Sequence, residues 1–197
     1  LDSNIPGEPT RGEASGGDGN DTLFNIENVV GSNYADTIYG NSLSNTLIGG
    51  LENDTIFAGA GDDLLRGDSG NDILDDGSGN DTVLGGLGHD TPSGSLGDDS
   101  LDGGDGSDYV DYSSLSNSLG DTEGIKVDLT INSQQDTKKA GLDTLKNIEN
   151  IIGSSYNDTI IGTNADNVIL AGNGNDTIVT NGSSASSGYD EIDGGSG

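Results

Sequence analysis

A nine-residue period runs through the chain and constrains its fold more than any other feature. Between residues 31 and 111 an acid, or once its amide, stands at every ninth position: Asp36, Asn45, Asp54, Asp63, Asp72, Asp81, Asp90, Asp99 and Asp108. An aliphatic residue follows two positions later in every unit except one, where Pro92 takes its place. A period this short predicts a solenoid, because each unit can bury its apolar residue only by stacking on its neighbours.

The composition favours a chain that becomes ordered only when it binds cations. The 197 residues include 35 Asp and Glu against 6 Lys and Arg, and only 29% are hydrophobic. So small an apolar share would ordinarily leave a chain disordered, because too little surface is buried to offset conformational entropy. Acids at a regular spacing can instead bind cations, and the binding free energy then contributes to folding. We therefore expect disorder without metal and order with it.

The charge and the side-chain inventory argue against several classes of function. A net charge of −29 argues against nucleic acid and anionic membranes as partners, since both require basic patches. No apolar run approaches the roughly 20 residues needed to span a bilayer. The chain has no cysteine and one histidine, so we expect no thiolate metal site and no enzymatic activity.

A longer period overlies the short one and indicates a tandem array. Residues 21–32 recur, nearly unchanged, 122 positions later as residues 143–154. Between the blocks, the alternating stretch 125–131 predicts a half-buried strand, and the polar run 132–140 predicts an exposed loop or hairpin end. The predicted segments are a connector with the end of a preceding period (1–30), a first repeat block (31–111), an inserted strand and loop connector (112–152) and a second, truncated block (153–197).

The turn of each unit, Gly-Gly-x-Gly-x-Asp, has the composition of a calcium-binding loop. Glycine permits positive φ, so the backbone can curl tightly and direct carbonyl oxygens inward. The Asp adds a hard anionic oxygen. Calcium takes six to eight oxygens at roughly 2.3–2.6 Å and accepts mixed carbonyl and carboxylate shells. One turn cannot supply six oxygens, but two stacked turns can.

The strand that follows each Asp implies which turns stack. Two nonapeptides make one coil of eighteen residues, so turns alternate between two edges and unit n stacks on unit n+2. A strand spacing of about 4.8 Å then brings successive acids of one row within reach of one ion. The pairs 63/81, 72/90, 81/99 and 90/108 are the best candidate sites, followed by 54/72, where Glu52 replaces a glycine.

The predicted metal-site residues are Asp54 together with acids and glycines of the turns that carry glycine in the fourth place. They are Asp54, Gly59, Gly61, Asp63, Gly70, Asp72, Gly77, Gly79, Asp81, Gly86, Gly88, Asp90, Gly97, Asp99, Gly104, Gly106, Asp108 and Asp176. The fourth glycine is missing around Tyr34, Leu43, Tyr156 and Ala165. We expect those four turns to be held by side-chain hydrogen bonds instead of metal.

The units 58–66, 67–75, 76–84, 85–93, 94–102 and 103–111 resemble the RTX, or haemolysin-type calcium-binding, nonapeptide repeat. The resemblance implies an all-β fold, a right-handed parallel β-roll with two nonapeptides per coil, here with an inserted strand or hairpin segment. It also implies several bound Ca²⁺ ions, export by a bacterial type I secretion system as an unfolded chain, and folding in external calcium.

Three functions follow from this interpretation. The first is a structural segment of a large secreted or cell-surface protein of the adhesin, fibril or surface-layer type, with neighbouring copies or a cell-surface polysaccharide as partners. The second is a non-catalytic calcium-binding module of a secreted enzyme such as a polysaccharide epimerase or protease. The third is a carbohydrate-binding or ice-binding surface. The 122-residue duplication favours the first.

Overall fold

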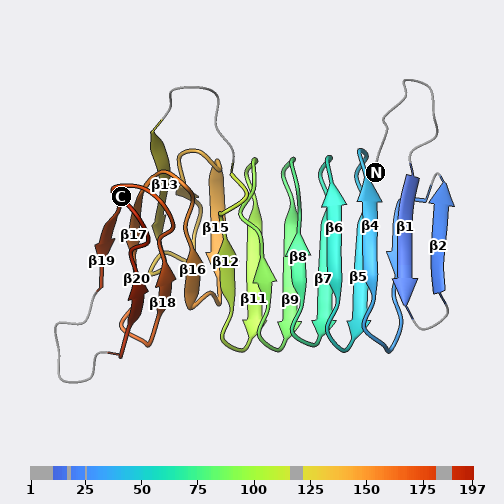
Figure 1. Ribbon diagram of the computed structural model, residues 1–197. Helices are drawn as coiled ribbons and strands as arrows, with labels where there is room; N and C mark the ends of the chain where they lie inside the picture. The colour runs from blue at the N-terminus through green and yellow to red at the C-terminus, as the bar shows by residue number, and fades with distance from the viewer. Residues whose placement is uncertain (1–10, 17–18, 25, 116–121, 181–187) are drawn as a thin grey trace.

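The computed structural model describes residues 11–16, 19–24, 26–115, 122–180 and 188–197, and every regular element among them is a β-strand. Figure 1 shows the strands standing side by side as one long stack, from β1 and β2 at one end to β18–β20 at the other. The predicted all-β solenoid is confirmed. No helix in the described part of the chain could cross a bilayer.

Two parallel sheets form the flanks of the first block. One sheet has the order β10 (Thr91–Pro92), β8 (Ile73–Asp75), β6 (Thr55–Gly59) and β4 (Thr37–Asn41), followed by the antiparallel strands β1 (Arg11–Gly16) and β2 (Gly19–Phe24). The other has the order β14 (Gln135–Asp136), β15 (Leu142–Lys146), β11 (Ser100–Asp105), β9 (Thr82–Leu87), β7 (Leu64–Ser69), β5 (Thr46–Leu51) and β3 (Asn28–Val30). Consecutive units therefore lie on opposite flanks.

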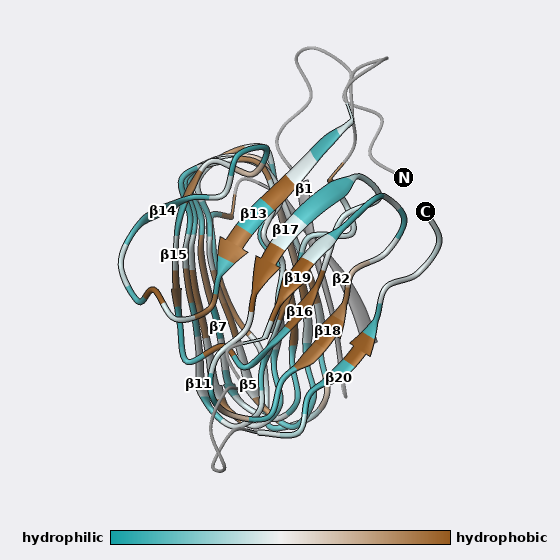
Figure 2. Cartoon of the chain, turned by 90° about the vertical axis from the view of Figure 1, so that its left-hand side faces the viewer, coloured by the Kyte–Doolittle hydropathy of each residue, from teal (hydrophilic) through white to brown (hydrophobic). Residues whose placement is uncertain are grey.

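The strand register confirms the predicted coil of two nonapeptides. Thr37 pairs with Thr55 on one flank, and Thr46 pairs with Leu64 on the other. Each strand thus lies against the strand eighteen residues further along the chain, which places unit n on unit n+2. Figure 2, which looks along the stack, shows the successive coils superposed around one interior.

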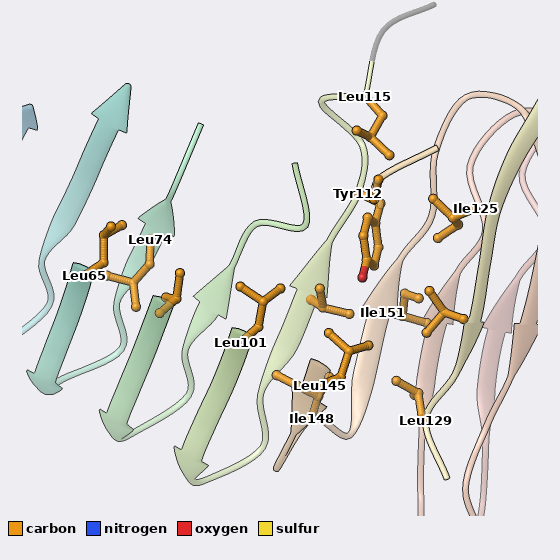
Figure 3. Close-up of a cluster of buried hydrophobic side chains, with 14 of the residues drawn as sticks. Leu65, Leu74, Leu101, Tyr112, Leu115, Ile125, Leu129, Leu145, Ile148 and Ile151 are labelled. Carbon is orange, nitrogen blue, oxygen red and sulfur yellow. The ribbon is translucent and has the colours of Figure 1, made fainter. Parts of the chain in front are cut away.

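The aliphatic residue of each unit points into that interior. In β6, Ile56 is fully buried, whereas its neighbours Thr55 and Phe57 are only partly buried. This alternation follows from the strand geometry, in which successive side chains point to opposite faces. Pro92, the exception to the aliphatic pattern, takes the same inward position and pairs with Leu74. The interior row is Ile38, Leu47, Ile56, Leu65, Leu74, Val83, Leu101 and Val110, and Figure 3 shows Leu65, Leu74 and Leu101 along it.

Two further parallel sheets continue the stack beyond the insertion. They are β12 (Tyr109–Asp111), β16 (Asn150–Ile152), β18 (Val168–Leu170) and β20 (Glu191–Asp193), and β13 (Glu123–Asp128), β17 (Asn157–Ile161) and β19 (Thr177–Val179). Between β12 and β15 the chain contributes β13, which pairs with β17, and β15 then lies directly on β11. The roll is therefore continuous across the insertion.

The strand predicted over 125–131 exists but is displaced. β13 starts at Glu123 and ends at Asp128, where the backbone N–H of Ile131 donates to the Asp128 carbonyl in a turn. Its burial alternates as predicted, since Ile125 and Val127 are buried and Lys126 is exposed. The polar run that follows contributes β14, which pairs antiparallel with β15, so the predicted hairpin is present.

Candidate metal centre

The structure brings the predicted acids together in two rows, one on each edge of the roll. In one row the backbone N–H of Asp54 donates to Asp72 Oδ1 at 2.7 Å. In the other the backbone N–H of Asp63 donates to Asp81 Oδ1, also at 2.7 Å. The same bond joins every consecutive pair, namely 36/54, 54/72, 72/90 and 90/108 in the first row and 45/63, 63/81 and 81/99 in the second. One carboxylate oxygen of each acid is thus used to tie neighbouring coils together.

The second carboxylate oxygen, Oδ2, has no hydrogen-bond partner although it is buried. This holds for Asp54, Asp63, Asp72, Asp81, Asp90, Asp99, Asp108 and Asp176. The first seven of these residues expose at most 3% of their surface. Buried polar atoms are almost always hydrogen-bonded, and an isolated buried anion is far costlier than a neutral group. A regular row of such oxygens has the chemistry that favours a bound cation.

Burial has a large effect on the acidity of these groups. It raises the pKa of Asp63, Asp72 and Asp99 from 3.8 to about 7. It raises the pKa of a second set, Asp54, Asp81 and Asp108, to about 6. Neighbouring carboxylates add to these increases, whereas the backbone N–H donated by the preceding coil opposes them. A cation between the oxygens would favour the charged form.

The glycines of the turns allow adjacent coils to approach closely. A Cβ atom on Gly77 would lie 1.8 Å from the Gly59 carbonyl oxygen, and one on Gly79 would lie 1.9 Å from that of Gly61. No side chain fits in that space. Most predicted glycines also adopt positive φ, namely Gly59, Gly61, Gly70, Gly77, Gly79, Gly86, Gly88, Gly97 and Gly104. Gly106 does not, but its Cβ would lie 1.6 Å from the Gly88 carbonyl oxygen.

Comparison with known families agrees with this geometry. The family model of the RTX calcium-binding nonapeptide repeat matches residues 14–24, 26–55, 39–74, 57–92, 93–119 and 148–182, which together make up more than half of the chain. The chain belongs to this family. No curated protein matches its sequence.

RTX repeats bind calcium, and the donor set of this RTX chain suits that ion. The unpartnered Oδ2 atoms are hard anionic oxygens, which calcium prefers over nitrogen or sulfur ligands. They recur in register between stacked turns, where the backbone of two coils is close enough to contribute carbonyl oxygens as well. The residues present therefore fit calcium.

The four RTX turns around Tyr34, Leu43, Tyr156 and Ala165 are built differently, and the side-chain hydrogen bonds predicted for them are confirmed. The backbone N–H of Ser32 donates to Asp36 Oδ2 at 2.5 Å, and that of Ser154 donates to Asp158 Oδ2 at 2.7 Å. In the other two turns the acceptor is the Asn side-chain oxygen, with the pairs Asn41–Asn45 and Thr163–Asn167. The oxygen that is free in the glycine turns is occupied here.

Three acidic residues lie in or beside the two rows but are not predicted by the nine-residue spacing. Asp143 Oδ1 accepts the backbone N–H of Asp99, and Glu149 Oε2 accepts that of Asp108, so both continue the rows beyond the insertion. The Gly-x-Asp spacing of residues 141–143 was a usable signal for Asp143. Asp76 stands outside the sixth place of its unit, yet it lies fully buried beside the second row.

Proposed function

We propose that the chain is a calcium-stabilised structural roll of an exported bacterial protein, in which ions bound between stacked turns hold the coils together. The buried, unpartnered Oδ2 atoms carry this proposal, because a row of anionic oxygens is stable in a folded chain only with cations beside it. The assigned sites are the pairs 54/72, 63/81, 72/90, 81/99 and 90/108, with a further ion at Asp176.

Folding in calcium follows from the same arrangement. The acids that lie close together in the roll are dispersed in the unfolded chain, so calcium binds the folded state preferentially and stabilises it. Extracellular calcium modules bind with dissociation constants of about 10⁻⁴–10⁻³ M. A chain with sites of that strength stays unfolded inside a cell and folds outside it. Proteins of the RTX family are typically secreted by bacteria, which supports export.

The structure of the long repeat supports a role in a tandem array, as in an adhesin, fibril or surface layer. Residues 21–32 span the end of β2 and β3, and their copy 143–154 spans β15 and β16. β3 carries one paired edge in the described chain, whereas β16 is paired on both edges, with β12 and β18. The repeated segment can therefore lie inside a longer stack, with a paired strand on each side, as its second copy does at β16. Neighbouring periods or a cell-surface polysaccharide are the proposed partners.

Circular dichroism across a calcium titration tests the proposal. Calcium-stripped protein should be largely unstructured, and β-structure should appear cooperatively at up to millimolar calcium. Magnesium at the same concentration is the control, since it demands octahedral geometry and releases its water reluctantly, and should induce little structure. Equal β-content with chelator and with calcium would contradict the proposal.

A further inference from the structure

Asp76 occupies the first place of its unit, where most neighbouring units carry glycine. That place faces the acid of the same turn. A Cβ on Gly67 would lie 2.2 Å from Asp72 Oδ2, and one on Gly85 would lie 2.5 Å from Asp90 Oδ2. A residue with a side chain at the first place is therefore directed into the metal-facing side of the turn. In the unit 76–84 that side chain is a second carboxylate.

Two hydroxyl groups hold the Asp76 carboxylate in one orientation. Ser93 Oγ and Ser95 Oγ both donate to Asp76 Oδ1 at 2.6 Å, and the backbone N–H of Asp76 donates to Ser93 Oγ at 3.1 Å. Both serines are buried. Ser95 stands in the second place of its unit, where the preceding unit carries Gly86. Asp76 and Ser95 thus stand at two positions where neighbouring units carry glycine, and their side chains hydrogen-bond to each other across one coil.

The other oxygen of Asp76 is left without a partner. Asp76 is fully buried, and its Oδ2 atom accepts no hydrogen bond. One carboxylate oxygen of each of Asp76, Asp81 and Asp99 lies within 4.8 Å of the other two. Oxygens bound to one calcium ion at roughly 2.3–2.6 Å can lie up to about 5 Å apart. A single ion therefore fits among all three.

We propose that Asp76, Asp81 and Asp99 form a three-carboxylate calcium site, the tightest of the roll. This inference rests on the proposed function, because Asp81 and Asp99 are one of its stacked pairs, and it adds a ligand from outside the Gly-Gly-x-Gly-x-Asp pattern. The charge of the ligand set tunes calcium affinity. A third carboxylate, already oriented by two serines, binds more strongly than the two-carboxylate pairs elsewhere in the rows.

Asp143 lies nearby and shows what a non-ligating acid looks like in the same region. Its Oδ1 atom accepts the backbone N–H of Asp99, and the hydroxyls of Tyr112 and Thr137 lie 3.2 and 2.8 Å from its Oδ2 atom. Both of its oxygens are occupied. Tyr112 also packs on Gly94, where a Cβ would lie 2.1 Å from the ring. The three-carboxylate site is thus bounded on this side by a closed hydrogen-bonded cluster, next to the coil from which the insertion leaves.

Isothermal titration of the whole calcium-stripped chain tests the inference, with calcium alone as the probe. Asp76→Asn keeps an oxygen for the two serines but removes the charge, and should weaken the tightest class of site at least about tenfold. Asp105→Asn is the matched control, because it removes the same charge from an exposed turn position and should change that affinity less than twofold.

Asp76→Gly, which restores the glycine found at the first place of neighbouring units, separates a ligand role from a structural one. It should reach the wild-type circular dichroism spectrum in saturating calcium while losing the tightest site. Titrations of both Asp76 variants that match the Asp105→Asn control would overturn the three-carboxylate site and leave the proposed function intact. A wild-type chain that binds no calcium would overturn the proposed function itself.

Discussion

The glycine turns of residues 49–108 and the four hydrogen-bonded turns near Tyr34, Leu43, Tyr156 and Ala165 share one backbone stack but use their acids differently. In both, the sixth-place residue accepts a coil-to-coil or turn hydrogen bond through one side-chain oxygen. In the glycine turns, the second oxygen is buried and unpartnered. At Asp36 and Asp158 that oxygen accepts a backbone N–H from its own turn.

The residue in the second place of the turn separates the two groups. Ser32, Asn41, Ser154 and Thr163 each donate their backbone N–H to the sixth-place side chain. In the glycine turns the second place instead adopts positive φ, as at Gly50, Gly59, Asp68, Gly77, Gly86, Gly104 and Gly172. Ser95 is the exception, and its hydroxyl binds Asp76. Positive φ at the second place of a turn therefore goes together with an unpartnered Oδ2 atom on the acid at the sixth place.

The two kinds of turn also follow each other in a fixed order. The hydrogen-bonded turns fall at 31–45 and 153–167, directly after the two copies of the connector sequence, and glycine turns follow in both cases. Each long period thus begins with a coil that is held by its own hydrogen bonds and continues with coils whose acids keep a buried, unpartnered oxygen.

Acid should produce the largest change in the calcium-free roll. Burial raises the pKa of Asp63, Asp72 and Asp99 to about 7, against 3.8 in the unfolded chain. These groups bind protons more tightly when folded, so their stabilisation is complete below pH 4 and is lost as pH rises to about 7. Calcium-stripped protein should gain β-structure between pH 7.5 and 4.5, as measured by circular dichroism. An unstructured chain at pH 4.5 would refute the burial of these carboxyl groups.

Asp81→Ala should cost more than a comparable change in a hydrogen-bonded turn. Asp81 faces both Asp63 and Asp99, so its loss weakens two sites, each contributing about 2.7 kcal/mol at a hundredfold excess of calcium over Kd. Asn45→Ala removes one buried acceptor and should cost about 1–3 kcal/mol. Urea unfolding with and without calcium measures both. Only the loss of unfolding free energy in Asp81→Ala should depend on calcium. An equal calcium dependence in both variants would contradict the difference between glycine turns and hydrogen-bonded turns.

Converting a hydrogen-bonded turn into a glycine turn should create a site. The triple variant Asn41→Gly, Leu43→Gly and Asn45→Asp removes the local donor geometry and places a carboxylate opposite Asp63. Titration calorimetry should show one additional bound calcium ion. Asn45→Asp alone is the control and should add none, because the Asn41 N–H would still occupy the carboxylate oxygen that the glycine turns leave free, as the Ser32 N–H does at Asp36. A gain of one ion in the single variant would show that charge, and not turn shape, decides binding.

Glu52→Gly should give the smallest effect, a gain of up to about 1 kcal/mol in the free energy of unfolding. Glu52 adopts φ 68° in the fourth place, a conformation that costs non-glycine residues roughly 1–2 kcal/mol, partly offset by the greater chain entropy of glycine. Its side chain is exposed, so no packing is lost. Leu51→Gly, at a neighbouring position without positive φ, should instead lower stability. Thermal unfolding in calcium compares the two variants. A loss of stability in both would show that the positive φ of Glu52 does not strain the turn.

Much of the fold and of the site could be predicted because one short period determines both. The spacing of the acids implied the coil of two units, the n and n+2 pairing and the two rows. Asp143 and Glu149 could not be placed in this way, because the insertion changes the distance along the chain between stacked residues to 44 and 41. Asp76 was missed because it occupies a glycine position, where only the three-dimensional packing shows which way a side chain would point.

A crystal structure of the calcium-bound chain, with ions located by anomalous scattering, tests the central claim most directly. The account predicts ions between the stacked glycine turns, at the Oδ2 atoms of Asp54 through Asp108, and none in the turns of Asp36, Asn45 or Asn167. Glycine turns without ions in a calcium-saturated crystal, or ions bound equally in the hydrogen-bonded turns, would contradict it.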